Sequence, residues 1–302
     1  EPYVEVNRFV ISFLEGDDPE EVHASVLGFI HQLNMGAQSM ASGLKFKPVG
    51  VEIMDKHSIA LAARNGHKLE AIPGNTQTVV ILDAAQAFDE KNKGPDEVIS
   101  WYLENGLMDA DLVMDEEKVS FVPLTQCQDV EAAEAFRLAG PDGARRVIKQ
   151  AFPTSTALST STDYAVAAWE KDLIMSYGTE LFRAQQDFLR LLEERGSRGF
   201  AFGYGHGSWR FDPHVRVVTD DKYAIEAFKA AKLEMGTKLV QLQQGGRRIR
   251  VRGEKPEQPY GEEYALIAKN RVPAHQASNR ALLEQLDPEG LFMHRAPERW
   301  KS

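Results

Sequence analysis

Histidines, an aspartate and glycines gather between residues 203 and 214, and such residues bind metals or phosphate in many proteins. His206 and His214 lie eight residues apart, with Asp212 between them. Metal sites usually draw on shorter spacings, so we interpret both histidines as surface or hydrogen-bonded core residues. The glycines alternate with aromatic residues, after a predicted helix and before a predicted strand. A dinucleotide-binding loop needs the reverse order, so a twisted strand or a packed loop is the better interpretation.

A run of arginines is the second group that could bind a ligand. In an extended strand, alternation places Arg248, Arg250 and Arg252 on one face. Such a face binds phosphate, RNA, anionic lipid headgroups or an acidic protein surface. The same run also fits an edge strand that its charge protects from aggregation, and both interpretations stay open. The predicted docking residues are Arg247, Arg248, Arg250, Arg252 and Trp300.

The third pattern is Ser159-Thr160-Ser161 followed far downstream by Glu263 in the stretch Gly261-Glu262-Glu263-Tyr264. It resembles the mono-ADP-ribosyltransferases of the cholera and pertussis toxin class, although that family has Gln or Glu where this chain has Gly261. The resemblance implies NAD as the cofactor, with Glu263 polarising the ribose hydroxyl and Ser159 positioning the nicotinamide end. Arg137 or Arg146 would hold phosphate. A carboxylate suits this reaction because it stabilises developing oxocarbenium charge.

Hydrophobic periodicity predicts the elements that carry these residues. A β-branched and aromatic run predicts a strand over 3–14, and Asp18-Pro19 then begins a helix with one apolar face. Further strands are expected at 44–54, 58–64, 78–82 and 119–122, and helical patterns follow Asp96 and cover 129–152. The second half predicts helices over 164–195, 222–235 and 274–286, with strands at 215–218, 239–242, 249–251 and 264–268.

This order of elements predicts an α+β fold. We expect two α/β-containing domains with small mixed or antiparallel sheets, and one long central helix at 164–195. The charge is uneven: residues 1–150 hold 25 acidic and 13 basic side chains, and residues 151–302 hold 20 and 22. The net charge of −10 therefore divides into −12 and +2. We predict an acidic α+β domain over 1–125, and over 126–302 a helical segment, a small-sheet α+β domain and a C-terminal extension.

Composition excludes several classes of protein. A single cysteine rules out a disulfide framework and a cysteine-rich zinc module, and we expect no metal and no resident cofactor. No apolar run approaches the roughly 20 residues that cross a bilayer. The first residue is Glu1 rather than Met, which indicates a processed or excised chain. We expect an intracellular, reducing compartment: a mitochondrial or other organellar interior after removal of a targeting peptide, or otherwise the cytoplasm.

The sequence shows no catalytic group of residues with a specific spacing. We therefore predict a non-catalytic accessory subunit of a larger assembly, organellar or viral, whose partners are other protein subunits. It would dock through the arginine run and an ordered C-terminal extension at 286–302. The alternatives are an ADP-ribosyltransferase-like enzyme that uses NAD and a module that binds RNA or anionic lipid.

Overall fold

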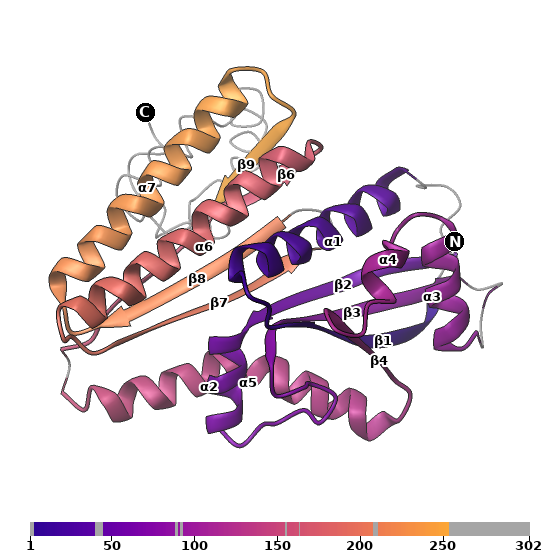
Figure 1. The fold of residues 1–302 in the computed structure, drawn as a ribbon, viewed down its shortest axis with the longest axis horizontal. Coiled ribbons are helices and arrows are strands. Elements are labelled where there is room, and N and C mark those ends of the chain that lie inside the picture. Colours follow the sequence, from indigo (N-terminus) through magenta and orange to yellow (C-terminus); the bar gives the residue numbers. More distant parts are fainter. Residues whose placement is uncertain are drawn as a thin grey trace, which may run out of the picture.

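The computed structural model describes residues 3–39, 45–87, 90, 93–154, 156–162, 164–207 and 211–253. Its strands form one nine-stranded sheet in the order β4-β1-β3-β2-β7-β8-β6-β9, with β5 pairing to β8 (Figure 1). All the strand pairings are antiparallel. The predicted α+β class is therefore confirmed, and strands from both halves of the chain share a single sheet.

The first four strands of this sheet belong to an N-terminal repeat with the element order strand–helix–strand–strand–helix–strand. Within it the strand order is β4-β1-β3-β2, which is the ferredoxin-like arrangement. Two short helices, α2 and α4, are added to this plan. The bounds are β1 (Tyr3–Leu14), α1 (Pro19–Ser39), β2 (Phe46–Asp55), α2 (Lys56–Arg64), β3 (Thr76–Ala87), α3 (Pro95–Glu104), α4 (Ala110–Val113) and β4 (Val119–Leu124).

The C-terminal repeat has the same element order, and its strands lie in the order β7-β8-β6-β9, which is the same plan read from the other end. A long helix, α5, and a short strand, β5, connect the two repeats. The bounds are α5 (Cys127–Ala151), β5 (Leu158–Ser161), β6 (Tyr164–Ala168), α6 (Lys171–Glu194), β7 (Gly199–Gly207), β8 (Phe211–Thr219), α7 (Lys222–Gln244) and β9 (Ile249–Gly253).

The two repeats meet where β2 pairs with β7. This pairing is short and covers only Glu52, Ile53 and Met54 opposite His206, Gly205 and Tyr204. The predicted domain boundary at 125/126 falls just after β4, close to the end of the N-terminal repeat. The sheet continues across the junction, and the division into two domains stays a prediction.

Helices cover both faces of the sheet. Figure 1 shows α1, α6 and α7 on one side and α2 and α5 on the other. Side chains of β1 alternate between the two faces of the sheet and are apolar on both, so helices bury both faces. Phe9, Ile11 and Phe13 pack with α1 and α3, whereas Val10 packs with α5 residues such as Phe136. Within the described residues, no helix is long and apolar enough to span a bilayer.

Several predicted elements are corrected by the structure. Residues 56–64 form helix α2 instead of a strand, because Asp55 accepts a hydrogen bond from the backbone N–H of Ser58 (2.8 Å) and caps the helix. Residues 164–168 form strand β6, which pairs with β9. The long helix accordingly begins at Lys171. Residues 239–242 continue α7. The elements predicted at 264–268 and 274–286 lie outside the described residues.

Candidate functional site

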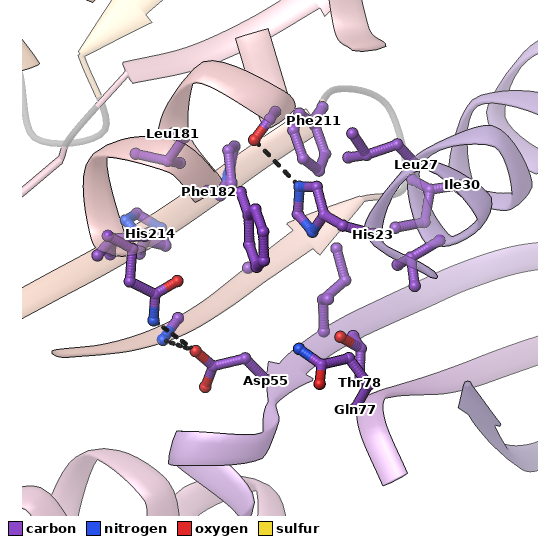
Figure 2. Close-up of a pocket in the computed structure, with 18 of the residues that line it drawn as sticks. His23, Leu27, Ile30, Asp55, Gln77, Thr78, Leu181, Phe182, Phe211 and His214 are labelled. Atoms are coloured by element: carbon purple, nitrogen blue, oxygen red, sulfur yellow. Dashed lines mark hydrogen bonds between the residues drawn. The ribbon is translucent and has the colours of Figure 1, made fainter. Parts of the chain in front are cut away.

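A cavity of about 70 Å³, partly open to solvent, lies where the two repeats meet. It is bounded by α1 and α6 and by strands β2, β3, β7 and β8, so both repeats contribute to it (Figure 2). Junctions between packed units are common places for ligand sites. Its apolar wall includes Leu27, Ile30, Leu181, Phe182 and Phe211.

His23 is the polar side chain that α1 contributes to this wall. Its Nε2 lies 3.0 Å from the carbonyl oxygen of Gly178 on α6, and its ring stacks on Phe182 at 4.7 Å between ring centroids with an angle of 19°. Burial lowers the pKa of His23 below its ordinary value near 6.5, although the hydrogen bond to Gly178 opposes the shift. The ring is therefore neutral at pH 7.

Asp55 is the carboxylate that lines the cavity, and its hydrogen bonds connect elements of both repeats. Its Oδ2 accepts hydrogen bonds from the side-chain amide of Gln185 (2.7 Å) and from the backbone N–H of Gly203 (2.8 Å). Its Oδ1 accepts the N–H of Ser58, whose hydroxyl donates to the Gly203 carbonyl at 2.7 Å. This carboxylate thus joins β2 and α2 of the N-terminal repeat to α6 and β7 of the C-terminal repeat.

The crossing of α1 and α6 depends on a glycine. A Cβ atom at Gly178 would lie 2.6 Å from Cδ1 of Leu27, closer than real Cβ contacts allow. The absence of a side chain lets the helices approach, and the Gly178 carbonyl then meets His23. The glycine-rich run at 199–207 serves close packing in the same way. It forms strand β7, where a Cβ at Gly203 would lie 3.2 Å from Oδ2 of Asp55.

The face of the sheet that α5 packs against carries a row of charged residues at the same junction. His206 and Glu52 are cross-strand partners, and Nδ1 of His206 lies 2.7 Å from the Glu52 carboxylate. Arg137 on α5 contacts Glu52 at 3.3 Å and also pairs with Glu134. The hydrogen bond from Arg137 lowers the pKa of Glu134. His214 is buried, and its ring centroid lies 5.9 Å from that of His206.

The two histidines singled out in the sequence are therefore neighbours in space. Nε2 of His214 lies 3.6 Å from the buried carboxylate of Asp212, beyond hydrogen-bond distance. Among the described residues, no group of three or more His, Cys, Asp or Glu side chains could hold a metal ion.

Within the described part of the chain, the residues that the transferase resemblance singles out lie on two elements, Ser159 on β5 and both arginines on α5. Ser159 is exposed on β5, opposite Val218 of β8. Arg137 is held in ion pairs by Glu134 and Glu52, and Arg146 contacts the side chain of Asn65 at 3.3 Å. Glu263 lies outside the described residues.

The predicted docking run is partly engaged within the chain. Arg247 pairs with Glu170 and Asp172, and its hydrogen bonds to them raise its own pKa. Arg248 and Arg250 are exposed, and the Arg250 guanidinium lies 5.9 Å from the centre of the Trp169 ring. The side chains of Arg252 and Trp300 lie outside the described part, as does the extension at 286–302. Binding of an acidic surface by this run stays a prediction.

No family model and no curated protein matches this chain. Solved structures match it at low identity. One is p-cresol methylhydroxylase with substrate bound, at 13% identity and a TM-score of 0.47, covering 99% of this chain and 53% of that one. Another is an alkyldihydroxyacetonephosphate synthase, at 10% identity and a TM-score of 0.45, covering 95% and 43%. A third is 4-ethylphenol oxidase from Gulosibacter chungangensis, at 15% identity and a TM-score of 0.43, covering 98% and 53%.

The chain spans about half the length of these solved structures. All three are named as enzymes, and none as an ADP-ribosyltransferase or as an accessory subunit. This finding contradicts the prediction of a non-catalytic subunit that docks in a larger assembly. It also contradicts the NAD-dependent transferase alternative, and we withdraw both. Binding of RNA or anionic lipid headgroups by the arginine run stays a prediction.

Proposed function

We propose that this chain is the part of an enzyme that binds a small, largely apolar organic substrate in the cavity between α1 and α6. The observation that carries the proposal is the cavity itself. Most of its surface is apolar, and polar side chains that include His23, Asp55 and Gln185 also line it. Apolar concave sites with a small number of positioned polar groups are the usual form of small-molecule sites.

The rigid setting of these polar groups supports a binding role. Asp55 and His23 are each held by groups from the opposite repeat, over sequence separations of 130 or more residues. A site fixed in this way is organised before the ligand arrives, which lowers the entropy cost of binding. Oxidation of the bound molecule is the first activity to assay, since an oxidase and a methylhydroxylase are among the structures named above.

The proposal is tested by a thermal-shift screen of the 302-residue chain against small para-substituted phenols and aliphatic alcohols of similar size. We expect at least one compound to raise Tm in a concentration-dependent way, because a ligand that binds only the folded state stabilises it. The cavity-filling variant Leu181→Phe should abolish the shift. The same enlargement at exposed Leu138, Leu138→Phe, should leave the shift unchanged.

Two results would overturn the proposal. One is the absence of any shift across the panel with the unmodified chain. The other is a shift that Leu181→Phe leaves intact, since the ligand would then bind outside the cavity. The prediction of an intracellular, reducing compartment stays a proposal that rests on the single cysteine.

A further inference from the structure

We infer that the cavity selects an uncharged molecule of about one ring that donates a hydrogen bond to Nδ1 of His23. The inference rests on the proposed function, because it assigns the ligand class of the same cavity. Three features of the described residues carry it: the hydrogen-bonding state of His23, the charges that line the cavity, and its size.

The first feature fixes which nitrogen of His23 can accept a hydrogen bond. A carbonyl oxygen only accepts, so the 3.0 Å contact with Gly178 requires the hydrogen on Nε2. In the neutral ring, Nδ1 then carries a lone pair. Nδ1 has no hydrogen-bond partner among the described residues and is not fully buried. Because His23 lines the cavity, a ligand bound there can reach this nitrogen. Phe182 holds the ring plane by stacking (Figure 2).

The second feature is the charge of the wall, which disfavours anions. No lysine or arginine is among the described residues that line the cavity. Its one carboxylate, Asp55, already accepts hydrogen bonds from Ser58, Gln185 and Gly203. An anionic ligand would lose its hydration and meet this carboxylate without a lysine or arginine beside it. A cationic ligand would find the carboxylate oxygens already bonded within the protein.

The third feature is the room that the cavity offers. About 70 Å³ is roughly half of the ~150 Å³ at which an apolar cavity in a protein holds benzene. The ligand is therefore no larger than about one ring, with part of it at the opening. Leu27, Ile30 and Phe211 would contact its apolar body, and its donor group would face His23.

Three compounds of matched shape test the inference: phenol, which donates a hydrogen bond, anisole, which cannot, and benzoate, which is anionic. Dissociation constants are measured by ligand-observed NMR at pH 7.5. One hydrogen bond to a neutral acceptor corresponds to about a three- to tenfold difference in affinity, so phenol should bind that much more tightly than anisole. Benzoate should bind at least about tenfold more weakly than phenol.

A variant at His23 tests whether this side chain supplies the hydrogen-bond acceptor. His23→Phe keeps an aromatic ring that can stack on Phe182 but has no hydrogen-bond acceptor, so the preference for phenol over anisole should fall to about onefold. The control is His31→Phe on the same helix, because His31 does not line the cavity. This control should keep the preference of the unmodified chain.

A pH series tests the same point without any substitution. Burial lowers the pKa of His23, so the ring stays neutral at pH 7 and gains a proton only below the ordinary value of 6.5. The carboxylates of Asp55 and Glu20 act against this shift, and His57 and His214 are the other titratable side chains besides Asp55 that line the cavity with His23. Protonation of Nδ1 removes its lone pair as an acceptor. The affinity for phenol should therefore decrease as the pH falls below 6.5, while the affinity for anisole should change less.

The outcomes distinguish this inference from the proposed function. Equal binding of phenol and anisole, or tighter binding of benzoate, would overturn the inference and leave the proposed function standing. A phenol preference that survives in His23→Phe would also overturn it. If none of the three compounds binds the unmodified chain at millimolar concentration, the proposed function fails and the inference fails with it.

Discussion

The two repeats share one topology but differ in how their helices and charges are used. In each repeat the first helix, α1 or α6, follows the first strand and packs on the same face of the sheet (Figure 1). Where the two helices cross, Leu27 and His23 of α1 contact Gly178 of α6. His23 also stacks on Phe182 of α6. Equivalent helices thus carry different residues where they cross beside the cavity.

The ion pairs of the two repeats show a second difference. In the N-terminal repeat, α5 covers ion pairs such as Arg8 with Asp83 and Glu134. In the C-terminal repeat, the comparable cross-element pairs of Arg247 with Glu170 and Asp172 are exposed. Removing one partner of a buried ion pair lowers the free energy of unfolding more than removing one partner of an exposed pair. We therefore expect electrostatic substitutions to matter more in the N-terminal repeat.

The largest expected effect is at Arg8. Its guanidinium contacts both oxygens of Asp83, at 2.6 and 2.8 Å, and its side chain is only 15% exposed. Arg8→Ala would leave a largely buried carboxylate without its cation, and we expect unfolding to become easier by about 3 kcal/mol in urea titrations. The matched variant Arg247→Ala should leave the urea midpoint nearly unchanged. Equal effects at both positions would remove the contrast between the repeats.

A smaller effect is expected at the helix crossing. Gly178→Ala would place a methyl group against Leu27, whereas at Gly28 on α1 the nearest atoms to a new Cβ belong to Lys171 at 3.9 Å. Both changes gain about 1 kcal/mol of helix propensity, so their difference isolates the packing cost. We expect Gly178→Ala to be less stable than Gly28→Ala by about 1–2 kcal/mol in chemical unfolding. A difference near zero would mean that the crossing is loose.

The sequence predicted those parts of the fold whose patterns are local. The strand at 3–14 and the helix that begins at Pro19 are confirmed because their hydrophobic periodicity is long and unbroken. Helix α2 was missed because it is short and its signal is a single capping aspartate, Asp55. The residues of β6 are mostly alanine and valine and merge with the helical pattern that follows. The repeat was missed because it is a repeat of topology, without a recurring motif.

The candidate site could not be predicted in the same way. His23 contacts Gly178 across 155 positions of sequence, and only the pairing of the two repeats brings them together. One local signal was present. A glycine in the middle of a strongly amphipathic helix carries a propensity cost that close packing can explain, and Gly178 occupies such a position. The arginine run was visible in the sequence, whereas the ion pairs that engage Arg247 depend on the fold.

The central claim is that ligands bind between α1 and α6, and methyl NMR tests it most directly. Phenol is titrated into the 302-residue chain with labelled methyl groups of leucine and isoleucine. The signals of Leu27, Ile30 and Leu181 should shift and saturate with one dissociation constant, because these residues line the cavity. Those of Ile81 and Leu124, in the core under α5, should stay in place. Shifts confined to Ile81 and Leu124, or no saturable shift at Leu27 and Leu181, would contradict the claim.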